Sequence, residues 1–194
     1  MNDQKNPWTL LSRSRKYEND WIAVDEHQVR HARGFSSAYG VVHNKQVGTQ
    51  TIAIDQEGRV CLVGQFRYPQ GLYSWELPAG GGGPDQLPLD TAKRELREET
   101  GLIANRWLPL LQLTVAGSIS DSRVFCFAAW ELEATERKLD PQEVIQRQNV
   151  SFKEAVGSAL NGTIRDSASV AALLALGRKL DAGDLPADLA AALR

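Results

Sequence analysis

The sequence has few cysteines and no excess of charge of either sign. Its 194 residues include two cysteines, too few for a fold held together by disulfides. Cys61 and Cys126 each lie in an apolar, strand-like segment, so we expect two buried thiols rather than a disulfide or a metal pair. The 22 basic and 24 acidic residues give a formal net charge of -2, which argues against general nucleic-acid binding.

Long hydrophobic runs are also absent. The longest apolar segment, 168–176, is interrupted by Ser169, whereas a membrane-spanning helix needs about 20 apolar residues. The first eight residues, MNDQKNPW, lack the apolar stretch of a secretion signal. We therefore expect a cytoplasmic protein without a membrane partner.

A run of four glycines, 80–83, divides the chain into two kinds of local pattern. Strand patterns dominate before it, and helices alternate with further strands after it. This mixture predicts an α+β domain with a mixed sheet. Residues 1–45 form an extra β layer with little core of its own, and residues 46–194 form the main domain. The predicted strands are 21–29, 37–42, 49–54, 59–68, 75–78, 107–115, 124–132 and 149–151; the predicted helices are 89–100, 153–160 and 167–180, and 133–143 is a charged loop.

The helix predicted at 89–100 carries three glutamates along one edge of its apolar stripe. With 100° per residue, Glu99 lies about 40° and Glu98 about -60° from Glu95. Like charges four residues apart, as in Glu95 and Glu99, destabilise a bare helix by a few tenths of a kcal/mol. One interpretation is a solvated acidic face that neighbouring basic residues neutralise in part. The other is a metal site.

The glycine run favours the metal site. Consecutive glycines cost conformational entropy and allow the backbone to approach a ligand closely. Carbonyl and carboxylate oxygens together suit Mg²⁺, which keeps several waters for substrate phosphates. The run is not a P-loop, because no Gly-Lys-Ser/Thr sequence follows it.

Gly80 and the segment Arg94–Leu102 resemble the Nudix box, G-x5-E-x7-R-E-U-x-E-E-x-G-U, where U is aliphatic. The sequence matches eight of its nine specified positions and departs at the first Glu, which is Gln86 here. The resemblance implies a Nudix-type α/β/α sandwich with a mixed sheet, preceded by an N-terminal antiparallel β layer. It also implies that Glu95, Glu99 and the carbonyl of Ala79 bind Mg²⁺, with Mn²⁺ as a substitute.

The resemblance extends to one branch of the family. The segments Gln65–Pro69 and Trp75–Gly80 are similar to the ADP-ribose and nucleoside-diphosphate-sugar pyrophosphatases. In that branch the extra N-terminal layer builds a homodimer, and the resemblance gives substrate contacts to Arg67 and Glu76. The alternatives are a surface ion pair for Arg67 and a structural strand glutamate for Glu76. The segment 116–121 lacks the proline typical of strict ADP-ribose enzymes, which favours a broader range of nucleotide sugars.

A general base completes the implied chemistry, since metal-bound water must lose a proton as it attacks phosphorus. In this branch the base commonly comes from a mobile loop late in the fold, and the resemblance assigns it to Glu143. Glu98 is the next candidate. Other loop acids, Glu133, Glu136 and Asp140, are nearby alternatives.

The sequence thus predicts a Mg²⁺-dependent hydrolase that cleaves nucleoside-diphosphate sugars such as ADP-ribose or GDP-mannose. The products would be a nucleoside monophosphate and a sugar phosphate. One alternative is hydrolysis of another nucleoside diphosphate derivative, such as a dinucleotide. Another is a non-catalytic nucleotide-sugar sensor, which only the missing box glutamate at Gln86 supports.

Overall fold

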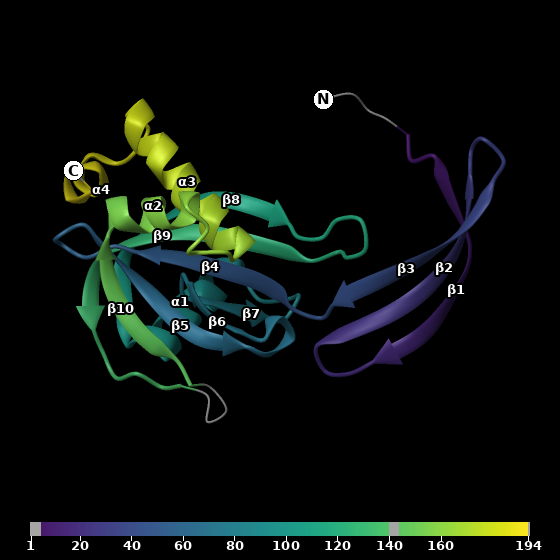
Figure 1. The fold of residues 1–194 in the computed structure, drawn as a ribbon, viewed down its shortest axis with the longest axis horizontal. Coiled ribbons are helices and arrows are strands. Elements are labelled where there is room, and N and C mark those ends of the chain that lie inside the picture. The colour runs from purple at the N-terminus through teal and green to yellow at the C-terminus, as the bar shows by residue number, and fades with distance from the viewer. Residues whose placement is uncertain (1–4, 140–143, 194) are drawn as a thin grey trace.

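The computed structural model describes residues 5–139 and 144–193, which form an N-terminal sheet and a larger α/β body (Figure 1). The N-terminal sheet extends away from the body in the view of Figure 1. Within the described part of the chain, no helix combines the length and the apolar composition needed to cross a membrane.

The N-terminal sheet contains β1 (Trp8–Glu18), β2 (Ile22–His31) and β3 (Ser36–Asn44), in that order. Both pairs are antiparallel, which confirms the antiparallel β layer expected from the sequence. Strand β1 was missing from that expectation, because Ser, Arg and Lys interrupt any apolar alternation in it. Most of β1 is exposed, so this sheet has little core of its own.

The body has two sheets. The larger one has the order β7-β4-β9-β8 and is mixed, because β4 and β9 run parallel whereas the other pairs are antiparallel. The smaller one has the order β10-β5-β6 and is antiparallel. Their strands are β4 (Val47–Ala53), β5 (Arg59–Arg67), β6 (Leu72–Glu76), β7 (Ala79–Gly82), β8 (Leu102–Thr114), β9 (Arg123–Ala134) and β10 (Gln146–Ser151).

Helices cover both faces of the larger sheet, as the side chains of β4 show. Ile52 belongs to the main core, which includes Leu173 of α3, whereas Ala53 packs in a second cluster with Leu96 of α1. A strand buried on both faces reads as a continuous apolar run, which explains the Thr-Ile-Ala-Ile sequence. The result confirms the predicted α/β/α sandwich. The helices are α1 (Pro88–Thr100), α2 (Phe152–Leu160), α3 (Ser167–Ala182) and α4 (Ala187–Ala192), with a 3-10 turn at Tyr68–Gln70.

Most of the glycine run forms a strand, although glycine has little strand propensity. Residues 79–82 make up β7, which pairs with β4 from Gln50 to Val47. Glycine is required at 80 for a steric reason: a Cβ there would lie 2.0–2.4 Å from the carboxylate atoms of Glu95. A Cβ at Gly83 would meet no atom within 4 Å. The run therefore lets α1 lie close against the strand.

Both cysteines are buried and free, as expected. Burial raises the pKa of Cys61 and of Cys126 to about 12. Their thiols therefore stay protonated at neutral pH and serve as small apolar side chains.

Candidate active site

Helix α1 presents Glu95 and Glu99 to strand β7. The helix begins with Pro88 in its first turn and ends at Gly101, whose left-handed conformation (φ 68°) terminates it. Glu99 is buried, with 2% of its surface exposed, and the backbone N–H of Ala79 donates to its Oε2 at 2.9 Å. Glu95 lies against the Cα of Gly80, in the space that a Cβ would fill. The structure thus brings together Ala79, Glu95 and Glu99, the three residues predicted to bind metal.

These three residues fit a hard divalent cation. The side chains offer only carboxylate oxygens, which Mg²⁺ prefers over nitrogen and sulfur ligands. Glu99 is nearly inaccessible to solvent, and the Glu95 side chain is 14% exposed. Both carboxylates are therefore largely shielded from bulk water. A solvated acidic face would leave both glutamates exposed, and this alternative is therefore wrong for Glu99.

Arg94 fixes the orientation of the helix relative to the strand. Its guanidinium is 2.7 Å from Oε1 of Glu95 and 2.7 Å from Oε2 of Glu98, and it donates to the carbonyl of Gly81 at 2.8 Å. One side chain therefore links two helix carboxylates to β7. Glu98 is 37% exposed and lies on the outer side of this arrangement, where it also lines a small cavity with Lys93 and Arg97.

Gln86 lies at the position of the box glutamate, near the start of α1. Its Oε1 would be 2.7 Å from a Cβ at Gly82, so its side chain packs on the strand. The residue is exposed. Gln86 therefore contacts β7, the strand that carries Ala79, whereas Glu99 lies near the other end of α1.

Arg67 and Glu76 form one bidentate ion pair. Nε of Arg67 donates to Oε1 of Glu76 at 3.0 Å and Nη2 donates to Oε2 at 2.6 Å. Burial opposes ionisation of Glu76, but the Arg67 guanidinium outweighs it and holds the pKa of the carboxyl below its ordinary value. The sequence singled out the two residues separately, and the structure adds that they act as a unit.

This pair lines a cavity of about 490 Å³ between β6 and the start of α3. The hydrogen bonds between Arg67 and Glu76 raise the pKa of Arg67, whereas burial lowers it. The negative charges of Asp166 and Glu99 also raise this pKa. The charged form of Arg67 is therefore stabilised mainly by Glu76. The remaining lining residues are Pro69, Gln70, Leu72, Ser74, Arg165 and Asp166.

A buried polar network positions the segment that leads into β7. The amide of Gln50 donates to the carbonyl of Leu77 at 3.3 Å, to Oγ of Ser169 at 2.5 Å and to Oδ2 of Asp166 at 3.0 Å. Ser169 also accepts the N–H of Leu77 at 3.0 Å, and Asp166 caps α3. Sequence reasoning missed these residues. The available signal was the helix-capping pattern Asp166-Ser-Ala-Ser before an apolar helix.

The predicted bases fall in different places. Glu143 and Asp140 lie outside the described residues. Glu133 accepts from Asn105 at 2.7 Å, and Glu136 is 76% exposed beside Lys138. Among the predicted bases that fall within residues 5–139 and 144–193, Glu98 is the one that shares Arg94 with the predicted metal ligand Glu95.

Arg137 and Arg147, which flank Glu143 in the sequence, both contact the end of α1. Nε of Arg137 donates to the carbonyl of Glu99 at 2.5 Å, and Nη1 of Arg147 donates to the carbonyl of Thr100 at 2.5 Å. Arg137 also donates to the carbonyl of Ile145 at 2.8 Å. The last carbonyls of a helix lack partners within it, so both arginines satisfy groups that burial would otherwise leave unpaired.

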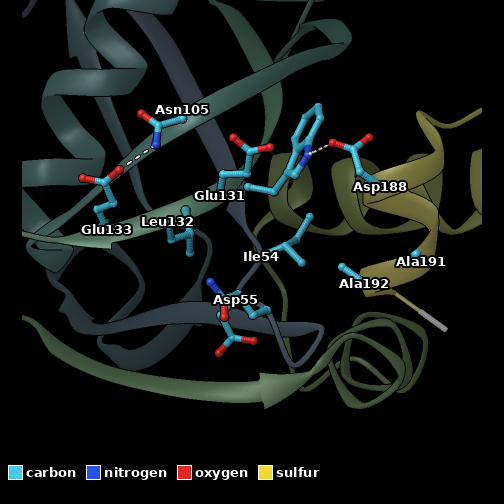
Figure 2. Close-up of a pocket in the computed structure, with 11 residues that line it drawn as sticks. Ile54, Asp55, Asn105, Glu131, Leu132, Glu133, Asp188, Ala191 and Ala192 are labelled. Carbon is cyan, nitrogen blue, oxygen red and sulfur yellow. Dashed lines mark hydrogen bonds between the residues drawn. The ribbon is translucent and has the colours of Figure 1, made fainter.

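A larger cavity, of about 550 Å³, lies elsewhere (Figure 2). It is formed by the turn after β4, the end of β9 and helix α4. Trp130 donates to Asp188 at 2.8 Å on one side, and Glu133 accepts from Asn105 on the other. None of the predicted site residues except the alternative base Glu133 lines it, so it is not part of the candidate active site.

The chain is similar to one known protein family and to several known proteins. The NUDIX domain matches residues 44–173. The ADP-ribose pyrophosphatase of Mycobacterium tuberculosis is 35% identical over 134 residues, covering 64% of this chain and 62% of the relative. That of Bacillus subtilis is 34% identical over 107 residues, covering 54% and 58%. The methanol dehydrogenase activator of Bacillus methanolicus is 30% identical over 124 residues, covering 63% and 67%.

The whole fold also has a solved counterpart. A crystal structure described as an ADP compounds hydrolase superposes with a TM-score of 0.83 at 18% identity, covering 94% of this chain and 98% of that chain. The alignments to the two ADP-ribose pyrophosphatases span about three fifths of their length. Because the matched domain takes up well over half of the 194 residues and contains the site just described, the chain belongs to the NUDIX family.

Proposed function

We propose that this chain is a Mg²⁺-dependent hydrolase of the diphosphate bond in nucleoside-diphosphate sugars, with ADP-ribose as the first candidate substrate. One observation carries the proposal: Glu95 and Glu99 of α1 meet Gly80 and Ala79 of β7, where the predicted metal ligands come together. Two relatives are named ADP-ribose pyrophosphatase. GDP-mannose remains a second candidate, because the segment 116–121 lacks the proline of strict ADP-ribose enzymes.

The residues divide the work as follows. Glu95, Glu99 and the carbonyl of Ala79 would hold Mg²⁺, which neutralises phosphate oxygens and lowers the pKa of a bound water when present. Arg67, oriented by two hydrogen bonds to Glu76, would bind the diphosphate or the terminal sugar. Arg94 would keep Glu95 in position. Catalysis would then consist mostly of positioning and charge stabilisation.

We assign the proton transfer to the carboxylate of Glu143. Arg137 and Arg147 support this assignment, because they attach the chain on both sides of this residue to the carbonyls of Glu99 and Thr100. Glu98, which forms an ion pair with Arg94, remains the alternative base.

The test is a hydrolysis panel with Mg²⁺ over ADP-ribose, GDP-mannose, UDP-glucose, NADH and nucleoside triphosphates, with products identified by mass. We expect at least one nucleotide sugar to turn over much faster than any triphosphate, giving a nucleoside monophosphate and a sugar phosphate. Faster turnover of NADH would favour the dinucleotide alternative. Tight ADP-ribose binding without turnover would favour the sensor.

We also propose that the N-terminal β layer, residues 1–45, forms a homodimer. Its support is the exposure of large apolar side chains on a sheet that buries few of its own, since exposed apolar patches mark interaction sites. Light scattering after gel filtration would give twice the 21.4 kDa chain mass for a dimer. The exposed apolar side chains of this layer are Leu10, Leu11, Tyr17, Trp21, Phe35 and Tyr39. The cytoplasmic location stays a prediction.

A further inference from the structure

A second group of metal-ligating side chains lies on the N-terminal sheet, apart from helix α1 in Figure 1. Asp25 and His27 are two residues apart on β2, so their side chains share one face of the sheet. His43 reaches the same place from β3. One donor atom from each of the three residues lies within 4.8 Å of the other two.

These donor atoms are buried and lack hydrogen bonds. Within the described part of the chain, the buried side-chain atoms without a hydrogen-bond partner are Oδ2 of Asp25, Nε2 of His27 and Nε2 of His43. The Asp25 side chain is completely buried, and the two histidines are 19% and 28% exposed. Oδ2 of Asp25 has a charged neighbour, the Arg13 guanidinium at 2.5 Å, so the two histidine nitrogens are the buried atoms whose lack of a hydrogen bond requires a reason.

The second nitrogen of His43 explains how its ring is presented. Nδ1 lies 2.6 Å from Oδ2 of Asp121, a carboxylate that can only accept, so Nδ1 carries the hydrogen. Asp121 is itself fixed, since its Oδ1 accepts the N–H of Asn44 at 3.0 Å. In the neutral ring, Nε2 then points a lone pair at Oδ2 of Asp25, 3.2 Å away. Two acceptors at this distance repel each other, and a cation held between them would be attracted by both.

We propose that Asp25, His27 and His43 bind a divalent transition metal ion, and that Zn²⁺ matches this ligand set. Imidazole and carboxylate ligands suit Zn²⁺, and a carboxylate that orients a ligating histidine, as Asp121 orients His43, is a common outer partner in such sites. Zn–N distances of about 2.0–2.1 Å place tetrahedral ligand atoms roughly 3.3 Å apart. The separations from Oδ2 of Asp25 are 3.2 Å to His43 and 4.0 Å to His27.

Two arginines share Asp25 with this site. Arg15 binds Oδ1, the oxygen that faces away from the histidines, and can stay when a metal binds. Arg13 lies 2.5 Å from Oδ2 and competes directly with a metal for that oxygen. Because the Arg13 side chain is 50% exposed, it can turn toward solvent. Removal of this competing charge should therefore strengthen metal binding.

The experiment uses full-length protein freed of metal by a chelator and carrying Glu95→Gln and Glu99→Gln, so that the α1 site does not contribute. Titration calorimetry with Zn²⁺ should show one ion per chain. His27→Gln and His43→Gln should each weaken binding about 10-fold or more, whereas Arg13→Gln should tighten it. His31→Gln, a control histidine on the same strand, should leave it unchanged. Circular dichroism checks that each variant folds.

Titration with Co²⁺ of protein in which Asp25, His27 and His43 are intact adds a spectroscopic readout. This readout does not depend on the histidine variants. Intense visible absorption, lost on addition of Zn²⁺, would support four-coordinate binding with nitrogen ligands. The proposal is overturned if no Zn²⁺ binds, or if binding survives both histidine substitutions. The hydrolysis panel is independent of this outcome, because the cluster is not used in the proposed reaction.

Discussion

Glu99 and Glu76 are both buried carboxylates, and each is held by a different kind of partner. The N–H of Ala79 donates to Glu99, whereas Arg67 forms a charged bidentate pair with Glu76. Helix periodicity could predict that Glu95 and Glu99 share one face, because this follows from sequence spacing alone. It could not predict the Arg67–Glu76 pair, which depends on the register of β5 and β6.

The Arg67–Glu76 pair predicts a defined pH dependence of stability. Arg67 lowers the folded-state pKa of Glu76, so the pair stabilises the fold above the unfolded-state pKa of about 4.3, and this contribution is lost as pH falls through the folded-state pKa. Glu76→Gln should therefore lower the free energy of unfolding at pH 7, and its difference from the wild type should shrink below about pH 4. Urea denaturation at several pH values measures this.

The control for this prediction is Glu136→Gln, which changes a carboxylate that is 76% exposed. It should leave the unfolding curve nearly unchanged at every pH. A Glu76→Gln difference that is the same at pH 3 and pH 7 would mean that packing, rather than charge, makes residue 76 important.

At the scale of elements, β7 and α1 make the site together. The sequence predicted the helix almost to the residue, because its proline start and glycine end are local signals. It did not predict β7, because glycines carry no strand propensity and only the pairing with β4 makes them extended. Fitting the strand against Glu95 is a tertiary constraint that composition does not reveal.

This contact makes Gly80→Ala informative. The added Cβ would overlap the Glu95 carboxylate, so we expect Glu95 to be displaced and kcat to fall by about 10²-fold, as for other small misplacements in active sites. The matched substitution Gly83→Ala places a methyl group in open space and should preserve activity. Steady-state assays at several Mg²⁺ concentrations compare the two. Equal activity of both variants would mean that Glu95 need not keep its position.

The segment between Arg137 and Arg147 carries the prediction for the base. Glu143→Gln should lower kcat by about 10²- to 10⁴-fold with little change in KM, the range expected for a lost general base. Glu133→Gln and Glu136→Gln serve as comparisons, since their side chains pair with Asn105 and Lys138. If Glu98→Gln alone shows the large loss, the base belongs to α1 instead.

At the scale of the whole molecule, the chain combines an α/β body that contains the candidate active site with an exposed N-terminal sheet. The sequence predicted the sandwich because the box motif and the alternating patterns are local. It did not predict β1, nor the cluster of Asp25, His27 and His43, because those residues meet only through the pairing of β2 with β3. The body's polar network around Gln50 was hidden for the same reason, since it joins β4 to α3.

The central claim is that Glu99 holds the catalytic metal ion of a nucleotide-sugar hydrolase. The most direct test is kcat for ADP-ribose, or for the best substrate of the panel, in Glu99→Gln at saturating Mg²⁺. Loss of a metal-held charge clamp should reduce kcat by about 10²-fold or more, with unchanged circular dichroism. Asp90→Asn, on the exposed first turn of the same helix, should keep wild-type activity. A wild-type kcat in Glu99→Gln would contradict the account.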